Sequence, residues 1–505
     1  MNTKLLRQKI LDLAIRGKLT DQCKSDGTAR ELLEKISASR RIEQSAKSAK
    51  SKDSAPIVPL DKSEAPFEIP DNWEWVKLGD VGKTITGATP SKNHPEYEGD
   101  EIPFLSPGDI SQANTITSYE SQGLSKQGKI LARPVPANTV LQVCIGGSIG
   151  KCAIVDREVC FNQQINSISV LIAKYEYIYA VLQSLYFQNE IILKATGTAT
   201  PIINKSSWDN LLVPLPPLAE QQRIVEKIEE AFAEIDAIEK NKELLKTHIK
   251  QTRQKILDLA IHGKLVPHDE NDEPASILLE KILQEKAQTE NKKSPKKKKT
   301  DDITTSDNRP YEKLTVEDEP FEIPNSWEWV KLGNVCNPIK RGKSPKYAEK
   351  GNVLVFAQKC NQKNGPISLE KALYLDKTAL SRYPQEDFLQ MGDVVVNSTG
   401  TGTLGRVGFF NETLPQNIKG IVPDSHVTTI RSSLVNSHYL YYFLKNKQPY
   451  LEKNGEGSTN QKELKPHTIY DLEFPFPPLA EQKRIADKVE KYFNLLDKMI
   501  FYLVQ

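Results

Sequence analysis

Polar side chains of the kinds that contact nucleic acids gather in short loops in both halves of the chain. In the first half these loops are Lys83–Lys92 (KTITGATPSK), Gly146–Lys151 (GGSIGK), Asn162–Gln164 (NQQ) and Gly197–Lys205 (GTATPIINK). In the second half they are Lys340–Lys346 (KRGKSPK), Gly400–Arg406 (GTGTLGR), Asp424–His426 (DSH) and Gly457–Leu464 (GSTNQKEL). Backbone donors, hydroxyls and cations suit phosphate oxygens, and Asn, Gln, Arg and Lys make paired contacts with base edges. Together the loops indicate a binding surface.

The candidate binding residues come from these loops and from the strands beside them. For any one of them the alternative is ordinary turn chemistry, but their recurrence in equivalent loops favours binding. In the first half they are Lys83, Thr89, Ser91, Lys92, Ser148, Lys151, Gln163, Gln164, Thr198 and Lys205. In the second half they are Lys340, Arg341, Lys343, Lys346, Asn397, Thr401, Thr403, Arg406, Ser425, His426, Thr459, Asn460 and Gln461. The candidates for base contact are Gln163, Gln164, Asn397, Arg406, His426, Asn460 and Gln461.

None of the candidate catalytic motifs in the sequence is complete. Gly400–Gly405 matches GxGxxG, but that fingerprint requires a following helix, whereas RVGFF is typical of a strand. We therefore reject dinucleotide or S-adenosylmethionine binding by this chain. LPPL and FPPL resemble the Asn/Asp-Pro-Pro-aromatic motif of amino methyltransferases, but Leu215 and Phe476 cannot accept a hydrogen bond from an amino group. HExxH, P-loop and GxSxG motifs are absent from the sequence, and we expect neither a catalytic centre nor a bound metal.

Composition limits the class of protein. The chain has 505 residues, which predicts several domains. A net charge of +2 means that any nucleic-acid surface must come from local charge. No segment approaches the roughly 18 apolar residues of a spanning helix, and the first twenty residues lack a signal-peptide core, so we expect a cytoplasmic protein that does not bind membranes. The six cysteines form no CxxC and are expected to be buried thiols.

The elements that carry the loops are repeated. RQKILDLAI recurs from Arg7–Ile15 at Arg253–Ile261, and PFEIP followed by WEWVKLG recurs from Pro66–Gly79 at Pro320–Gly333. PPLAEQ recurs from Pro216–Gln221 at Pro477–Gln482. The anchors keep one cyclic order and little else matches, so we infer a repeated frame around two divergent inserts.

A coiled coil is the predicted frame. After PPLAEQ, a 4,3 apolar spacing runs from Ile224 to Leu259 and is broken only by Lys242 and Thr252, and Gly263 stops the helix. The same seam resumes from Ile485 to Leu503 and from Leu6 to Leu13. We infer that the two terminal helices pack antiparallel against the central helix. The alternative is two tandem domains with ordinary amphipathic helices, which does not explain why the chain ends fall inside the repeated seam.

The connecting segments are expected to be short helices followed by solvated linkers. Helices are predicted at Ala29–Ile36 and Ala275–Ile282, and linkers at 37–63 and 284–308. The run Lys296–Lys299 could contact phosphate, although a flexible loop is the simpler interpretation. Each insert then opens with a Trp pair, Trp73/Trp75 and Trp327/Trp329, on a strand that we expect to pack in a core.

Taken together, the chain resembles the specificity subunit of type I restriction-modification systems. The residues that carry the resemblance are WEWVKLG, the TPSK loop (Thr89–Lys92), STGTGTLGR (Ser398–Arg406), the DSH sequence and PPLAEQ. The resemblance implies two target-recognition domains, each of which reads one half of a split double-stranded DNA site. It implies no catalysis by this chain itself. It also implies two methylation subunits and two restriction subunits as partners, and S-adenosylmethionine, ATP and Mg would belong to those partners. The long, poorly matched linkers depart from a compact frame.

The expected fold class is α+β, with two mixed α/β domains held apart by an antiparallel coiled coil in a pseudo-twofold cyclic repeat. The expected segments are an N-terminal coil helix (1–20), a short helix and basic linker (21–65), the first target-recognition domain (66–217), the central coil helix (218–265), a short helix and Lys-rich linker (266–319), the second target-recognition domain (320–478) and the C-terminal coil helix (479–505). A fixed coil would set the half-sites about 10–10.5 bp apart.

Two other function classes stay open at this point. A coiled-coil scaffold whose inserts bind protein or glycan would have the same seam, and only salt-dependent affinity for duplex DNA would tell it apart. An enzyme with its own methyltransferase or nuclease is disfavoured, because the repeat leaves no room for a fused catalytic domain.

Overall fold

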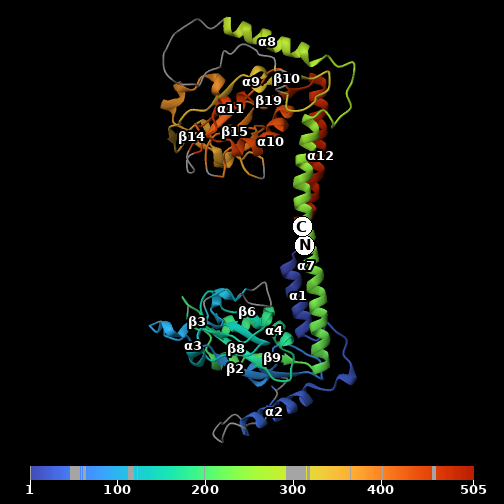
Figure 1. Cartoon of the computed structure of the whole chain (residues 1–505), viewed down its shortest axis with the longest axis vertical. Coiled ribbons are helices and arrows are strands. Elements are labelled where there is room, and N and C mark those ends of the chain that lie inside the picture. The colour runs from blue at the N-terminus through green and yellow to red at the C-terminus, as the bar shows by residue number, and fades with distance from the viewer. Residues whose placement is uncertain are drawn as a thin grey trace. The chain divides into compact units, whose positions relative to one another are not determined.

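The computed structural model describes residues 2–45, 57–58, 60, 64–91, 93–111, 119–121, 123–197, 199–291, 314, 319–363, 366–400, 402–457 and 462–504. The chain divides into two compact units, Met1–Glu243 and Leu244–Gln505. Each unit combines a sheet-containing domain with helices (Figure 1). Helix α7 (Leu218–Ile261, 44 residues) contributes to both units, its first part to unit 1 and its second part to unit 2.

In unit 1, α1 (Thr3–Ile15) packs antiparallel against the first part of α7. Ile224, Ile228 and Ile235 of the predicted seam are buried there, whereas Ile238 is exposed. Near the start of α1, the guanidinium of Arg7 lies 4.9 Å from the Phe232 ring centroid and 2.6 Å from the Asp236 carboxylate.

Unit 2 repeats this packing with α12 (Leu479–Val504) against the second part of α7. The Arg253 guanidinium lies 4.7 Å from the Phe493 ring centroid and 2.5 Å from the Asp497 carboxylate. Ile249 and Ile256 of α7 and Ile485 and Val489 of α12 are buried. Helix α7 ends at Ile261, and Gly263 has φ +68°. The antiparallel coil and its glycine stop are therefore confirmed.

The repeated PPLAEQ sequence joins each helix to its domain. In unit 1, the buried Gln221 amide donates to the Pro216 carbonyl (2.9 Å) and accepts from the Lys174 backbone N–H (2.8 Å). The buried Glu220 carboxylate accepts from the Trp73 indole (2.8 Å) and from Gln22 (2.5 Å). Burial raises the pKa of Glu220, and these hydrogen bonds oppose the shift. The motif thus anchors the helix start to Trp73, which directly precedes β1, whereas Trp75 lies within the strand.

Unit 2 has the same anchor with one change. Gln482 donates to the Pro477 carbonyl (2.9 Å) and accepts from the Asn436 N–H (2.9 Å). Glu481 accepts from the Trp327 indole (3.0 Å), but the place of Gln22 is taken by His268, whose Nδ1 lies 2.7 Å from the Glu481 carboxylate. The recurrence of PPLAEQ is explained by this buried hydrogen bonding.

The first domain is built on a four-stranded antiparallel sheet in the order β2-β8-β5-β6. Strand β1 pairs with β9 and β4 pairs with β7. The core beside α4 and α5 contains the buried Trp73, Tyr177, Phe187 and Trp208. The elements are β1 (Glu74–Lys77), β2 (Gly82–Thr86), β3 (Glu98–Ile102), β4 (Phe104–Leu105), α3 (Lys126–Leu131), β5 (Thr139–Val143), β6 (Cys152–Val155), β7 (Cys160–Phe161), β8 (Ile165–Val170), α4 (Tyr175–Gln183), α5 (Leu185–Lys194), α6 (Lys205–Asp209) and β9 (Leu212–Leu215).

The second domain has the equivalent sheet β11-β18-β15-β16 and a second four-stranded sheet, β12-β14-β13-β17, in which β13 and β17 are parallel. Strand β10 pairs with β19. The elements are β10 (Glu328–Lys331), α9 (Leu332–Val335), β11 (Ile339–Arg341), β12 (Tyr347–Ala348), β13 (Val353–Phe356), β14 (Leu373–Leu375), β15 (Val394–Asn397), β16 (Val407–Phe409), β17 (Gly420–Pro423), β18 (Val427–Ile430), α10 (Ser437–Lys453), α11 (Pro466–Tyr470) and β19 (Glu473–Phe476). The expected α+β fold class with two mixed domains is confirmed.

The two short helices run further than the sequence predicted. Helix α2 spans Ala29–Ser45 and α8 spans Ala275–Asn291, so the proposed linkers begin later than residues 37 and 284. Both extensions lack Pro and Gly, and each is held to its domain by a cation. Arg40 donates to the Gly82 carbonyl (3.2 Å), and Lys286 donates to the Gly333 carbonyl (2.6 Å). The run Lys296–Lys299 lies outside the described residues.

Candidate nucleic-acid interface

In the first domain, four polar loops meet at one edge of the β2-β8-β5-β6 sheet. Because the strands are antiparallel, with Thr86 opposite Asn166 and Val143 opposite Ile165, the end of β2, the start of β8 and the end of β5 share this edge. The Cys144 N–H donates to the Gln164 carbonyl (2.8 Å), and the Gly146 N–H donates to the Pro201 carbonyl (2.9 Å). The described residues 86–91, 144–151, 162–164, 196–197 and 199–205 therefore form one group, which we call the first loop cluster.

The second loop cluster consists of the described residues 339–346, 398–400, 402–406, 424–426, 456–457 and 462–464, at the matching edge of the β11-β18-β15-β16 sheet. The Ser398 N–H donates to the His426 carbonyl, and the Leu464 N–H donates to the Ser398 carbonyl (both 2.8 Å). Thr399 and Glu463 form an antiparallel bridge. The loops that the sequence grouped by composition are thus brought together in space in both domains.

The two clusters share a backbone design. A Cβ at Gly87 would lie 2.2 Å from two carbonyl oxygens, and one at Gly342 would lie 2.2–2.3 Å from the equivalent pair, so both turns require glycine. Asn162 accepts from the Gln164 N–H (3.0 Å), and Asp424 accepts from the His426 N–H (2.8 Å). The same turn is therefore held by an amide in one domain and by a carboxylate in the other.

Different side chains stand on this common backbone. In the first cluster, the Thr89 hydroxyl donates to the Gln163 side-chain oxygen (2.5 Å), and both residues are exposed. In the second, the Thr399 hydroxyl lies 2.6 Å from Nδ1 of the exposed His426. These exposed pairs offer amide groups in one domain and an imidazole in the other, which are different hydrogen-bonding patterns for a ligand.

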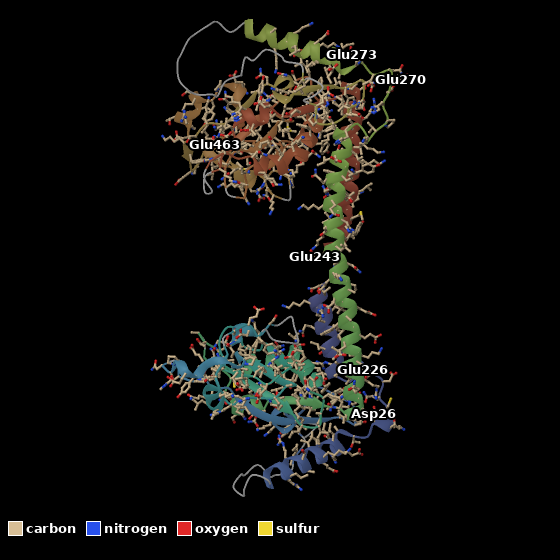
Figure 2. The ribbon with its side chains drawn as sticks, viewed as in Figure 1. Asp26, Glu226, Glu243, Glu270, Glu273 and Glu463 are labelled. Carbon is tan, nitrogen blue, oxygen red and sulfur yellow. The ribbon has the colours of Figure 1, made fainter. Side chains whose placement is uncertain are left out.

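Four basic side chains of the second cluster have internal carboxylate partners. Lys340 and Lys343 lie 2.5 Å and 2.6 Å from the two oxygens of Asp387. Arg341 is paired with Glu463, which lies among the loops of the second domain in Figure 2, and Lys346 lies 3.3 Å from Asp376. Burial lowers the pKa of Arg341 and raises the pKa of Asp424 beside it. The local charge is therefore more balanced than the loop sequence alone suggests.

Known proteins identify the family. The sequence profile of the type I restriction modification DNA specificity domain matches residues 70–247 and 324–500, one match for each domain with its adjoining helix. The chain belongs to this family. Its two loop clusters therefore lie in two copies of a DNA specificity domain.

Relatives in this family match along nearly the whole chain. The specificity subunit of the type I restriction enzyme EcoAI from Escherichia coli is 26% identical over 563 residues, which covers 99% of this chain and 90% of the relative. That of MjaVIII from Methanocaldococcus jannaschii is 24% identical and covers 85% and 88%. The crystal structure of the HsdS subunit from Thermoanaerobacter tengcongensis superposes with a TM-score of 0.52 at 19% identity and covers 87% of this chain and 93% of that one, which supports the same fold.

A residue that contacts DNA must be accessible to it, so the exposure of each candidate residue matters. Thr89, Ser91, Gln163 and His426 are exposed members of the clusters. Lys83 is exposed too, but it stands within β2, before the cluster begins. The half-buried candidates are Ser148, Lys151, Gln164, Lys205, Lys340, Arg341, Lys343, Thr403, Arg406 and Ser425, and Lys346 is exposed. Lys205 is drawn toward Asp209 (2.5 Å) and the Thr84 hydroxyl (2.6 Å).

Two candidate DNA-binding side chains make hydrogen bonds within the second domain. Asn397 is buried, and its amide donates to the Gln358 carbonyl (3.1 Å) and accepts from Asn361 (3.2 Å). Arg406 donates to the carbonyls of Asn361 (2.7 Å) and Gly402 (3.0 Å). Both hold loops in place, and their contact with DNA stays a prediction. Lys92, Thr198, Thr401, Thr459, Asn460 and Gln461 lie outside the described residues.

The structure adds residues that the sequence interpretation passed over. Gln358 joins the second cluster through its side-chain oxygen, which accepts from the Thr403 hydroxyl (3.1 Å). Its surroundings, QKCNQKN at 358–364, contain the same Gln, Asn and Lys types that marked the other loops. Arg133 reaches the first cluster by donating to the Thr86 carbonyl (3.4 Å), and only the folded chain reveals it.

The described parts of the chain contain neither a cluster of metal-ligand side chains nor a membrane-spanning helix. No group of three or more His, Cys, Asp or Glu side chains there is placed to hold a metal ion. No helix within those parts is long and apolar enough to cross a bilayer.

Proposed function

We propose that each loop cluster reads one half of a bipartite double-stranded DNA site, and that the chain directs adenine methylation or restriction carried out by partner subunits. The observation that carries this proposal is the pair of clusters on matching sheet edges, with one backbone design and different side chains. Equivalent loops with different donors and acceptors suit two unrelated half-sites. Gln163, Gln164 and His426 are the candidates for contact with bases. The lysines and hydroxyls are the candidates for contact with phosphates.

In this proposal the chain supplies specificity and no catalysis. Two methylation subunits would bind S-adenosylmethionine, and two restriction subunits would bind ATP and Mg. The whole complex would act on DNA in the cytoplasm. Membership of the specificity family, and relatives named as specificity subunits of type I restriction enzymes, support this division of labour.

The test is co-expression with a methylation subunit, followed by sequencing of modified bases in the host DNA. We expect a split motif with methylated adenines that appears only when this chain is present. A matched pair of variants, Gln163→Ala in the first cluster and His426→Ala in the second, should alter one half of the motif each. Both are exposed, so neither should disturb folding. A stable complex without any new motif, or salt-independent binding to protein or glycan in place of DNA, would contradict the proposal.

A further inference from the structure

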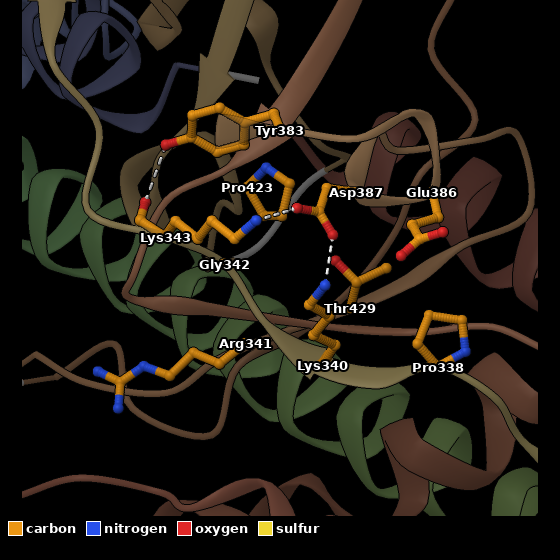
Figure 3. Close-up of a pocket in the computed structure, with 10 residues that line it drawn as sticks. All are labelled: Pro338, Lys340, Arg341, Gly342, Lys343, Tyr383, Glu386, Asp387, Pro423 and Thr429. Atoms are coloured by element: carbon orange, nitrogen blue, oxygen red, sulfur yellow. Dashed lines mark hydrogen bonds and ion pairs between the residues drawn. The ribbon is translucent and has the colours of Figure 1, made fainter. Parts of the chain in front are cut away.

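A pocket in the second domain lies beside the second loop cluster. It is lined by residues that include Lys340, Lys343, Tyr383, Glu386 and Asp387 (Figure 3). Lys340 and Lys343 come from β11 and the loop after it, which belong to the second loop cluster. Asp387 and Tyr383 come from a separate segment between β14 and β15. The pocket therefore places an acidic group from outside the cluster against two of the cluster's cations.

Asp387 holds both lysines at once. Its two carboxylate oxygens accept from Lys340 (2.5 Å) and Lys343 (2.6 Å), and Figure 3 shows the carboxylate between the two ammonium groups. The Asp387 side chain is only 6% exposed, whereas those of Lys340 and Lys343 are 29% and 35% exposed. Burial acts to raise the pKa of Asp387, but the two lysines overcome this and hold the pKa below its ordinary value. The carboxylate is thus charged and accepts from both ammonium groups.

The two lysines differ in how firmly they are held. Lys343 also donates to the Arg382 carbonyl (2.6 Å), and its ammonium lies 5.5 Å from the Tyr383 ring centroid. For Lys340, the hydrogen bond to Asp387 is the one that the structure records among the described residues. Loss of the carboxylate would therefore remove the bond that holds Lys340, whereas Lys343 would keep its bond to the Arg382 carbonyl.

We propose that Asp387 is a specificity-determining residue that acts as an internal substitute for a DNA phosphate. It occupies Lys340 and Lys343 and so keeps them from gripping DNA of any sequence. Nonspecific binding depends almost entirely on cations that neutralise phosphates. A lysine that leaves Asp387 for a phosphate takes one partner away from a charged and nearly buried carboxylate, which is unfavourable. The internal pair thereby lowers nonspecific affinity more than specific affinity, which also gains base contacts. This inference rests on the proposed function.

The test compares Asp387→Asn with Glu386→Gln in the full chain purified with a methylation subunit. Both changes remove one negative charge from the same pocket. However, Glu386 is exposed, and within the described residues no ion pair joins it to either lysine. The probes are a 30-bp duplex of mixed sequence that lacks the methylated motif and a second duplex that carries it. Affinity is measured across a series of salt concentrations.

We expect Asp387→Asn to tighten binding to the mixed-sequence duplex and to steepen its salt dependence. Each freed lysine adds about 0.9 to the slope of log affinity against log salt. If a lysine–phosphate contact contributes nothing to affinity at about 1 M salt, one freed lysine raises nonspecific affinity about 8-fold at about 0.1 M salt. Two freed lysines raise it about 60-fold. Binding to the motif should change less, so the ratio of specific to nonspecific affinity falls. Glu386→Gln should leave the slope unchanged.

A second pair of variants keeps the inference testable if Asp387→Asn does not fold. Because Asp387 occupies the lysines in nonspecific complexes and yields them only when base contacts add to the binding, Lys340→Gln with Lys343→Gln should weaken binding to the motif-bearing duplex far more than binding to the mixed-sequence duplex. Adding the same two changes to Asp387→Asn should abolish its gain. The inference is overturned if the double lysine variant loses as much nonspecific affinity as specific affinity, or if Asp387→Asn behaves as Glu386→Gln or weakens binding. A parent complex with no salt-dependent affinity for either duplex would instead overturn the proposed function.

Discussion

Replacement of Gln221 tests whether the repeated PPLAEQ sequence anchors the start of α7 to the first domain. Replacement by Ala removes a buried amide that donates to the Pro216 carbonyl and accepts from the Lys174 N–H. An unpaired buried polar group costs about 1–3 kcal/mol. The Pro216 bond is buried, whereas the Lys174 bond is only partly buried and open to replacement by water. We therefore expect unit 1 to lose about 2–4 kcal/mol of unfolding free energy.

The neighbouring residue supplies a matched control. Gln222 stands next to Gln221 on α7, and its amide donates to the exposed Glu226 one turn along the same helix (2.8 Å). Such a surface pair contributes about 0.2–0.5 kcal/mol. Gln222→Ala should therefore be nearly neutral, although it removes the same amide group from the same turn of helix.

The assay is urea unfolding combined with hydrogen exchange read by mass spectrometry. Gln221→Ala should speed exchange in the first domain and in the first part of α7, with unit 2 unchanged. The mirror variant, Gln482→Ala, should do the reverse, because Gln482 makes the same two bonds to Pro477 and Asn436. The reasoning is refuted if Gln221→Ala is as mild as Gln222→Ala, or if either variant loosens both units equally.

Three further predictions concern half-site recognition, the pH dependence of stability and the length of the spacer. Arg406→Ala removes two bonds that hold the second cluster. Recognition of the second half-site alone should weaken by about 1–3 kcal/mol, measured as affinity for half-site variants, and an equal loss at both half-sites would contradict independent readers. Burial raises the pKa of Asp424, so the folded state favours the protonated carboxyl, and stability is lost as pH rises through the folded-state pKa. Asp424→Asn, which copies Asn162, should abolish this loss in thermal melts between about pH 4 and pH 8; identical pH profiles would argue against it. Insertion of one heptad in α7 adds about 10.5 Å of helix, or about three base pairs at 3.4 Å each, and should lengthen the spacer of the methylated motif without changing its half-sites; altered half-sites would sink this idea.

The frame was readable from the sequence because its signals are local and periodic. The seam of Ile224, Ile228 and Ile235 follows a helical spacing that only packing against another helix explains, and those residues are buried. Gly263 marks the end of α7 because a positive φ suits glycine. The strand after Gly405 was predicted from RVGFF, and β16 starts at Val407. Each of these elements is decided by residues close together in the chain.

The pairing of charges was not readable, because it depends on contacts between distant segments. Lys340 and Lys343 read as free cations in a loop with few acids, yet Asp387 neutralises them from a segment more than 40 residues away. The helix extensions of α2 and α8 were missed for a similar reason, since Arg40 and Lys286 fix them to the domains. Composition can identify a polar loop, but only tertiary structure tells which of its groups are already occupied.

The loop clusters separate what holds their backbone from what they present. Gly87 and Gly342 fix the same turn through backbone crowding, and Asn162 and Asp424 cap the same turn with a side-chain oxygen. None of these contacts involves the exposed Gln163 or His426 side chains, which stand beside them. Substitution of the exposed residues therefore leaves the turn intact, and the two copies can diverge in what they bind without loss of fold. We infer that this independence allows one repeated frame to carry two unrelated readers.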